Sequence, residues 1–207
     1  YSNILSLVSK YHLDPDGGLD PRISIDDLDK HQSGIIALTG GCKGGIGKLL
    51  ANDQYENAEK LLLRLGKIFS ENLYLEIQRH HLPLEDKIEG MTLDLAYKHD
   101  VPLVATNDCY FESEDMHEAH NVLLCIAGSN TITNPNRRQA TKEHRFKTAE
   151  EMKKLFSDLP EAINNTTVIA KRCSFMPSTR DPILPKFVTE ENKDEKSELE
   201  RMALEGL

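Results

Sequence analysis

The feature that most constrains the fold is an alternation of short apolar runs with amphipathic stretches in the first half of the chain. The apolar runs at 34–39, 73–77 and 101–106 predict three strands, and the first has the composition of a strand buried on both faces. Residues 54–70 repeat apolar side chains every three or four positions, as does a stretch marked by Leu84, Ile88, Met91 and Leu95. Both stretches predict amphipathic helices. This alternation predicts βαβ units and an α/β fold with a parallel sheet or barrel.

The second half of the chain is predicted to be mainly helical. Residues 117–126 carry an apolar face with helical spacing. Thr148 with Glu151, and Asp158 with Glu161, have the spacing of a capping residue followed by an acid. Each pair predicts the start of a helix.

A change in composition predicts a boundary between two parts near residue 177. Three prolines stand within 177–185, and an acidic, polar run follows from Glu190 to Glu200. Apolar residues at helical spacing occupy 196–207, and a similar pattern stands at the beginning of the chain. Because both patterns run to the ends of the sequence, we expect the chain to be part of a longer protein.

The composition argues against several classes of protein. Acidic residues outnumber basic ones by 34 to 25, and the net charge of −9 opposes nucleic-acid binding unless Lys and Arg cluster on one face. The sequence indicates no such cluster. The four cysteines include no C-x-x-C pair, which indicates reduced thiols in a cytoplasmic protein. No apolar run approaches the roughly 20 residues needed to cross a bilayer, so no membrane role is expected.

The glycine-rich segment 40–48 invites comparison with a phosphate-binding loop, because a strand is predicted before it and a helix after it. Its spacing does not fit that motif. Cys42 stands five residues before Gly47, where the motif needs Gly, and Leu49 replaces the magnesium-binding hydroxyl. The segment is therefore interpreted as a tight turn between a strand and a helix.

Asp108 is the main candidate for chemistry because it stands two residues after a predicted strand, where parallel α/β folds gather catalytic side chains. Cys109, His117 and His120 follow, and the two histidines share a helical face. One interpretation is a zinc site. No known ligand spacing is reproduced, however, and a turn or cap role for Asp108 is the alternative.

Polar residues in and after the second predicted strand are harder to assign. Glu76 lies between apolar neighbours and is either a paired structural carboxylate or an acid that faces a site. His80 and His81 point to different sides of the backbone, so both are interpreted as surface or loop residues.

Several longer motifs together resemble the PHP domain of bacterial DNA polymerase III alpha subunits. The clearest are PLVATND at 102–108 and EAHNVLLCI at 118–126. Other segments also look like the family and follow its order: GIIALTGG at 34–41, LYLEIQ at 73–78, residues 152–173, and ILPKF at 183–187. The resemblance covers essentially the whole chain.

The resemblance implies a partial PHP-type distorted (β/α)7 barrel followed by a helical segment that leads to the palm. Residues 1–176 would be the C-terminal part of the PHP domain, and 177–207 a linker and the start of the palm-proximal region. The first strands, with their His and Asp ligands, would precede Tyr1, and the polymerase carboxylates would follow Leu207. No catalytic residue and no cofactor is therefore expected in this chain, while magnesium is expected for the full-length polymerase.

The resemblance also identifies ligand positions that this sequence has lost. Family members with a working metal site have a Cys after Ser/Thr-Gly, and Asp-x-His after Thr-Asn. Gly41 stands in place of that Cys, with Cys42 one position late, and Tyr110 stands in place of the His. Asp108 alone matches, as a vestigial ligand. These departures resemble members of the family whose PHP domain has become structural.

Three functions are therefore compared. The favoured one is a structural and interaction module of a subunit that synthesises DNA by nucleotidyl transfer. The resemblance implies the proofreading exonuclease subunit and other holoenzyme subunits as partners, with DNA contacted only through the full-length chain. The second is an active PHP-type metal-dependent phosphoesterase or 3'-5' exonuclease that uses Asp108. The third is a small α/β hydrolase with a Cys nucleophile, for which no motif places a base.

Overall fold

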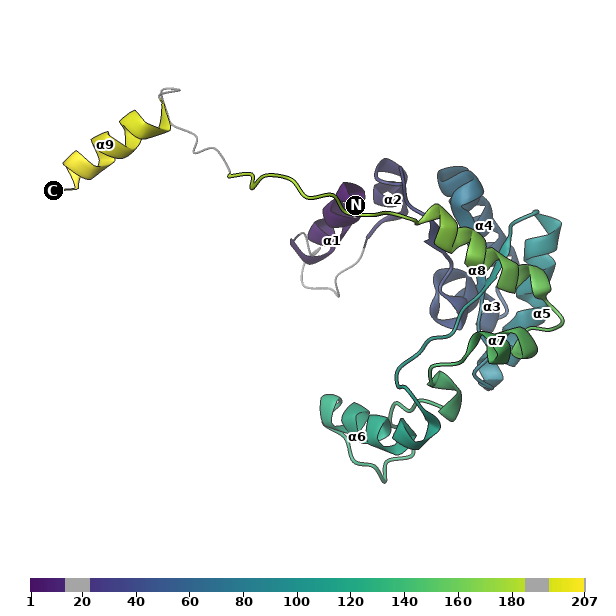
Figure 1. The fold of residues 1–207 in the computed structure, drawn as a ribbon. Coiled ribbons are helices and arrows are strands. Elements are labelled where there is room, and N and C mark those ends of the chain that lie inside the picture. Colours follow the sequence, from purple (N-terminus) through teal and green to yellow (C-terminus); the bar gives the residue numbers. More distant parts are fainter. Residues whose placement is uncertain (14–22, 185–193, 207) are drawn as a thin grey trace. The chain divides into compact units, whose positions relative to one another are not determined.

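Three short parallel strands form a sheet in the order β1-β2-β3 (Figure 1). They are β1 (Ala37–Leu38), β2 (Leu73–Ile77) and β3 (Leu103–Ala105). The structure is a computed structural model that describes residues 1–13, 23–184 and 194–206. Ala37 pairs with Leu73, and Leu75 pairs with Leu103. The predicted parallel α/β arrangement is confirmed, whereas these strands alone form no closed barrel.

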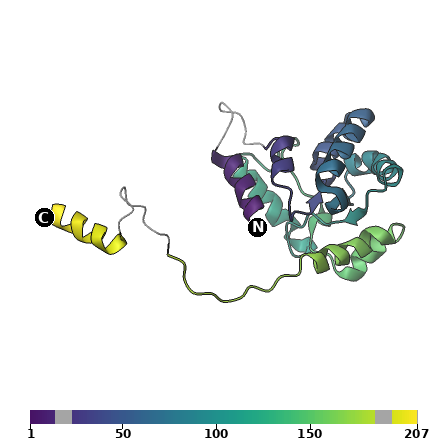
Figure 2. The same cartoon turned by 90° about the horizontal axis from the view of Figure 1, so that it is seen from above.

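Helices follow the strands in the predicted alternation, and the helices within 45–98 and 160–172 lie beside the sheet in Figures 1 and 2. The helices up to residue 173 are α1 (Ser2–Leu13), α2 (Ile25–Lys30), α3 (Gly45–Ala51), α4 (Tyr55–Phe69), α5 (Pro83–Lys98), α6 (His117–Ala127), α7 (Ala149–Leu155) and α8 (Pro160–Arg172). Four short 3-10 turns complete this part: η1 (Gly41–Lys43), η2 (Ser70–Asn72), η3 (Glu114–Met116) and η4 (Lys142–His144).

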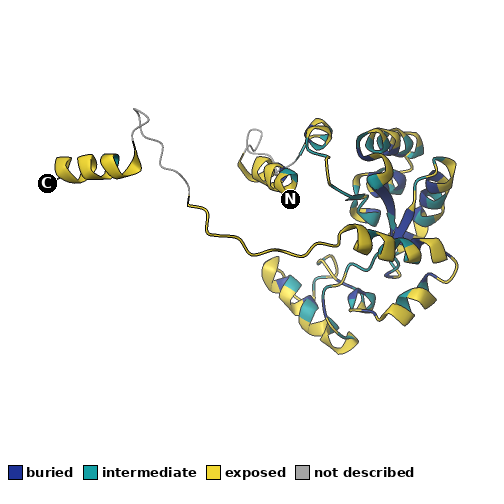
Figure 3. Cartoon of the chain, turned by 45° about the horizontal axis from the view of Figure 1, so that its top comes forward, coloured by how far each residue is buried: buried dark blue, intermediate teal, exposed yellow. Residues whose placement is uncertain are grey.

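The hydrophobic core lies between the sheet and the helices α3, α4, α5 and α8. Strands β2 and β3 are the most deeply buried elements, as the dark blue ribbons in Figure 3 show. Leu62 of α4, Leu95 of α5 and Ala162 of α8 all lie in this core and are fully buried. Each buried Leu contributes roughly 1.5–3 kcal/mol relative to an exposed one, so the apolar stripes predicted for α4 and α5 fix these helices on the sheet.

The first strand differs from the prediction. Pairing is limited to two residues, and the Leu38 side chain is 42% exposed. A turn closed by the Ile35 N–H on the Gln32 carbonyl precedes β1, and Gly40 follows it with a left-handed φ of 79°. Among the described residues β1 pairs only with β2, so it is an edge strand. Because Ala37 is only partly buried and Leu38 is exposed, the prediction of a strand buried on both faces is wrong for this chain by itself.

The start of α8 also differs from the prediction. Helix α8 begins at Pro160 with Leu159 in the N-cap position, so Asp158 does not cap it. Both carboxylate oxygens of Asp158 instead accept hydrogen bonds of 2.7 Å from Arg79. Proline at the first helical position already supplies a suitable φ and has no N–H to satisfy, which removes part of the need for a capping side chain.

The predicted start of α7 is confirmed. Thr148 accepts a hydrogen bond from the Glu151 N–H, and the Glu151 carboxylate accepts one from the Thr148 N–H at 2.8 Å. These reciprocal bonds form a capping box and satisfy two amides at the start of the helix.

Helix α6 is present as predicted, but its most apolar side chains face solvent. Val122, Leu123 and Ile126 are 42%, 62% and 69% exposed, and we refer to them as the α6 stripe. The buried side of the helix carries Asn121 and Cys125 instead. Asn121 accepts the Ala140 N–H at 3.0 Å, so a polar contact orients the helix.

Residues from Ser174 onward form a second unit, described here by itself. It contains α9 (Glu195–Glu205), where Asp194 accepts the Ser197 N–H at the N-cap. The predicted stretch 183–187 lies outside the described residues from 185 onward, as do residues 190–193 of the acidic run. The expected PHP boundary after residue 176 stays a prediction. Within the ranges described, no helix has both the length and the apolar character that a membrane span needs.

Candidate functional site

The carboxyl ends of the three strands bring together loops that are far apart in sequence. The chain leaves β1 into η1, leaves β2 into residues 78–82, and leaves β3 into residues 106–110. Because the strands are parallel, these loops share one edge of the sheet, which is the usual position of functional sites in α/β folds.

Asp108 lies at this edge and is held by two side chains. Its Oδ2 atom lies 2.6 Å from Lys43 Nζ and accepts a 2.6 Å hydrogen bond from the Tyr110 hydroxyl. Lys43 Nζ also lies 2.7 Å from the Tyr110 oxygen. Partial burial acts to raise the pKa of Asp108, but the hydrogen bonds from Lys43 and Tyr110 outweigh it, so the pKa lies below its usual value. The carboxylate is therefore ionised and paired within the chain.

His80 is buried beside Asp108 and is not a surface residue. The Asp108 N–H donates to His80 Nε2 at 3.2 Å, so the ring proton lies on Nδ1, which donates to Glu85 at 2.8 Å. The His80 backbone N–H donates to the same carboxylate at 2.6 Å. His80 lies in the loop after β2, as one of its two predicted roles required, but the surface role is wrong. Burial is possible because Glu85 satisfies the His80 donors. His81 is exposed as predicted, and its φ is 58°.

Four aromatic rings stack across the site. The ring of His144, from η4, lies 4.1 Å from that of His80 and 5.0 Å from that of Tyr110. Tyr110 stacks in turn on His120 of α6 at 5.3 Å. Burial lowers the pKa of His144 to about 4, so this imidazole is neutral at physiological pH. The stack therefore fixes Tyr110 from both faces.

The other proposed ligands do not converge on Asp108. Cys109 is exposed, and His117 Nε2 lies 2.8 Å from the Ala140 carbonyl oxygen, which suits a structural hydrogen bond. His120 contributes its ring face to the stack, and its Nε2 is buried with no hydrogen-bond partner among the described residues. Within the part of the chain that the structure describes, no three His, Cys, Asp or Glu side chains are grouped to hold a metal ion.

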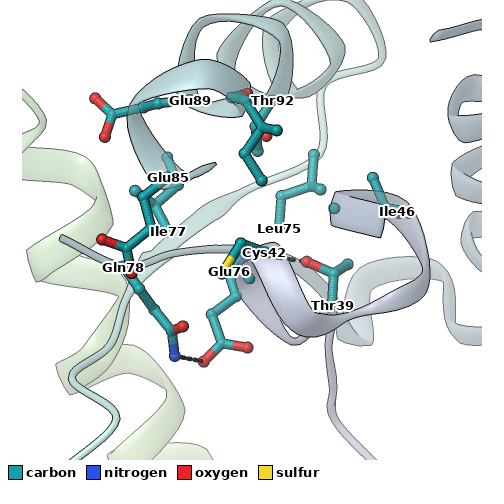
Figure 4. A pocket seen from close by; sticks show the side chains of 13 residues that line it. Thr39, Cys42, Ile46, Leu75, Glu76, Ile77, Gln78, Glu85, Glu89 and Thr92 are labelled. Atoms are coloured by element: carbon teal, nitrogen blue, oxygen red, sulfur yellow. Dashed lines mark hydrogen bonds between the residues drawn. The ribbon is translucent and has the colours of Figure 1, made fainter. Parts of the chain in front are cut away.

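A second group of hydrogen bonds at the ends of the strands centres on Glu76 (Figure 4). Glu76 accepts hydrogen bonds from the Gly40 N–H at 2.8 Å, from the Thr106 hydroxyl, and from the Gln78 amide at 3.4 Å. This carboxylate is thus a paired structural group that joins the ends of all three strands, one of the two roles left open by its sequence position.

The glycine-rich turn shapes the same edge. Gly41 has a φ of 53°, and a Cβ at that position would lie 2.7 Å from the Gln78 side-chain oxygen. A Cβ on Gly44 would lie 1.8 Å from the Thr39 carbonyl oxygen. The interpretation as a tight turn is confirmed. Burial, followed by the charge of Glu85, raises the pKa of the Cys42 thiol in this turn, so Cys42 is neither a thiolate ligand nor an activated nucleophile.

The sequence interpretation missed four members of the site: Lys43, His80, Glu85 and His144. A lysine in the turn after a strand is a detectable signal, and so is an acid at the third position of a helix, which Glu85 occupies in α5. His144 gives no local signal, because only the tertiary fold brings it to His80.

Comparison with known proteins agrees with the resemblance found in the sequence. The family model of the PHP domain matches residues 1–80. The chain is 44% identical over all 207 residues to the DNA polymerase III subunit alpha of Caulobacter vibrioides, and covers 18% of that protein. It is 41% identical to the Rickettsia bellii subunit over 92% of the chain, and 36% identical to the Haemophilus influenzae subunit over 91%, covering 16% of each relative. The chain thus spans less than one fifth of these curated relatives. Along its whole length the chain is therefore similar to one PHP-containing segment of bacterial DNA polymerase III alpha subunits.

Proposed function

We propose that this chain is a structural and interaction module of a DNA polymerase III alpha subunit, and that the full-length subunit performs template-directed DNA synthesis in the cytoplasm. The similarity to subunits of that name along the whole chain carries the proposal. Because the chain covers 18% of such a relative, the nucleotidyl-transfer site and its magnesium ions are proposed to lie elsewhere in the full-length protein.

The proposed architecture is a distorted (β/α)7 barrel to which the three strands contribute. The edge position of β1 supports it, because among the described residues one side of this strand has no partner strand. A preceding strand of the full-length protein would pair there and cover Leu38. Residues 1–176 are proposed to belong to the PHP domain, and 177–207 to the connection toward the palm.

A PHP-type metal phosphoesterase or 3'-5' exonuclease is the second candidate. The position of Asp108 and His80 after the carboxyl ends of parallel strands, with the His144 ring stacked on His80, supports it. The donor set does not fit a divalent ion, however. The closest partners of Asp108 are an ammonium and a phenol, the Cys42 thiol is protonated, and Gly41 offers no side chain. No hydrolytic step is therefore assigned to the site.

The full-length subunit, purified without added metal, distinguishes the two candidates. Primer extension with magnesium should show DNA synthesis, elemental analysis should find no stoichiometric zinc, manganese or iron, and labelled single-stranded DNA should not be degraded from its 3' end. Stoichiometric metal that is lost in Asp108→Asn, together with hydrolysis that is lost in the same variant, would establish the phosphoesterase instead.

The partner proposed for this module is the proofreading exonuclease subunit, within a larger holoenzyme. The α6 stripe supports an interaction role, because neighbouring large apolar side chains exposed to solvent are typical of a binding surface. The Asn121 contact with Ala140 keeps this face outward. Binding through the stripe would remove apolar surface from water at about 25 cal/mol per Å².

Paired substitutions test this surface. Leu123→Asp with Ile126→Asp should weaken the affinity of the full-length subunit for the exonuclease subunit at least roughly tenfold, since two buried apolar contacts are worth more than the 1.4 kcal/mol that a tenfold change requires. Val168→Asp on α8 is the matched control, because Val168 is also exposed, at 44%. Unchanged affinity in the stripe variant would place the exonuclease on another surface.

A further inference from the structure

The two loops that carry Gly41 and Tyr110, where the resemblance places metal ligands, are joined by a cation of the chain itself. Lys43 extends from η1 to the end of β3 and brings Nζ within 2.6 Å of Asp108 Oδ2. We propose that the Lys43 ammonium takes the place of a metal ion beside Asp108, so that the chain itself supplies the positive charge that joins the loops after β1 and β3. This inference rests on the proposed structural role of the module and specifies how that role is achieved.

The geometry matches replacement of an ion. Lys43 Nζ, Asp108 Oδ2 and the Tyr110 oxygen form a triangle with sides of 2.6, 2.7 and 2.6 Å. A divalent ion bound to the same carboxylate would lie about 2.0–2.3 Å from its oxygen, in the space that the ammonium fills. Two cations cannot share that space.

The same turn explains why a metal-binding cysteine has no room. The Gln78 side chain occupies the space beside Gly41, and the positive φ of Gly41 would strain any other residue. The Gln78 amide is itself held by the Thr106 hydroxyl at 3.1 Å. Restoring Cys at position 41 would therefore displace Gln78 and disturb the hydrogen bonds around Glu76.

The chemistry of the two cations differs in a way that fits a structural site. A divalent ion can bind several ligands and a water and lower the pKa of that water, whereas an ammonium offers only hydrogen bonds. Two of the three Lys43 donors are engaged, by Asp108 and Tyr110. The ammonium therefore balances the charge of the ionised Asp108 carboxylate and has no means of lowering the pKa of a water.

Hydrogen exchange measured by mass spectrometry on the full-length subunit tests the inference locally, with manganese chloride as the probe. Lys43→Met keeps the side-chain stem and removes the charge, so the segments around 39–48 and 104–110 should exchange faster. Manganese should restore their protection in Lys43→Met through the vacated carboxylate, but not in Lys43→Met with Asp108→Asn. The wild type, Lys43→Arg and the exposed control Lys48→Met should show slow exchange that manganese does not alter.

Three other results would contradict the inference. If manganese leaves Lys43→Met unchanged while the wild type is free of metal, Lys43 does not stand in for an ion, and the structural function is unaffected. If the wild type itself responds to manganese in these segments and contains stoichiometric metal, the structural function fails as well. If Lys43→Met does not fold, adding Asp108→Asn should restore the fold, because the unpaired carboxylate is then the cause. No recovery would overturn the inference.

Discussion

Glu85 is the residue on which the loop after β2 depends. Its carboxylate accepts hydrogen bonds from the His80 N–H, from His80 Nδ1 and from the Leu82 N–H, and both Glu85 and His80 are buried. Burial acts to raise the pKa of Glu85, but the bonds from His80 prevail and hold the pKa below its usual value. The acid is thus kept ionised in order to satisfy buried donors.

Glu85→Ala should lower the free energy of unfolding by about 3 kcal/mol, because it leaves two buried donors of His80 without an acceptor. Urea denaturation of the chain measures this value. Asp86→Ala is the matched control on the same turn of α5, where the side chain is exposed, and should stay within about 0.5 kcal/mol of the wild type. Equal effects of the two substitutions would show that Glu85 acts only through the charge at the helix start.

At the scale of elements, the capping box of α7 gives a pH-dependent contribution. The hydrogen bond from Arg145, followed by that from the Thr148 N–H, lowers the pKa of Glu151 from its ordinary value of 4.5 to about 2. Because the folded-state pKa is depressed, the stabilisation is complete above 4.5 and is lost as the pH falls from there toward 2.

Glu151→Gln should therefore flatten the acid limb of the stability curve, since the amide oxygen can still accept the Thr148 N–H but does not titrate. The measurement is urea denaturation of both proteins across this pH window. Thr148→Ala should cost about 1 kcal/mol at every pH, because it removes the other half of the box. If the stability of Glu151→Gln and that of the wild type fall in parallel with pH, Glu151 is not the source of this pH dependence.

Near the start of α8, Asp158 forms an ion pair with Arg79 and does not cap the helix. A double-mutant cycle distinguishes the ion pair from a capping role. Arg79 is bound to Asp158, to Glu89 and to the Leu155 carbonyl, and it lies 4.7 Å from the centre of the Phe156 ring. Asp158→Ala should cost up to about 1 kcal/mol in the wild type, because this carboxylate is largely exposed, and almost nothing in an Arg79→Ala background. An undiminished cost in that background would restore the capping role that the sequence predicted.

These elements also show which features of the fold can be predicted from the sequence. Periodicity and capping signals predict β2, α4, α5 and α7 because local chemistry determines them. Asp158 was misassigned because its partner Arg79 lies 79 positions away, and no local pattern reveals such a pair. For the same reason the sequence does not reveal that His80 and His144 belong to one site. Their rings stack only after the tertiary fold brings the loop after β2 and η4 together. Asp108 could be found from its place after a strand, whereas its pairing with Lys43 depends on the tertiary fold.

At the scale of the whole molecule, two properties bear on function: the net charge of the chain, and the fraction of its relatives' length that it covers. The net charge of −9 gives the chain a repulsive interaction with a polyanion. Lys43 is also paired with Asp108, and Arg79 with Glu89 and Asp158, so both basic side chains are engaged within the chain. Phosphate contacts dominate the affinity of DNA-binding proteins, so a chain of this balance is expected to bind DNA weakly by itself.

The 207-residue chain alone should therefore neither bind a primed template tightly nor extend it, although the full-length subunit should do both. The expected reason is that phosphoryl transfer depends on positioned carboxylates and magnesium ions, which the proposal assigns to other parts of the subunit. Primer extension with magnesium, together with fluorescence anisotropy of a labelled primer-template, compares the two proteins at equal molar concentration. Adding the isolated chain to the full-length subunit should leave the extension rate unchanged, which excludes an inhibitor in the preparation. Magnesium-dependent, template-directed extension by the isolated chain would refute the assignment, because the Asp108 site holds its carboxylate on Lys43 and offers no other cluster for two metal ions among the described residues.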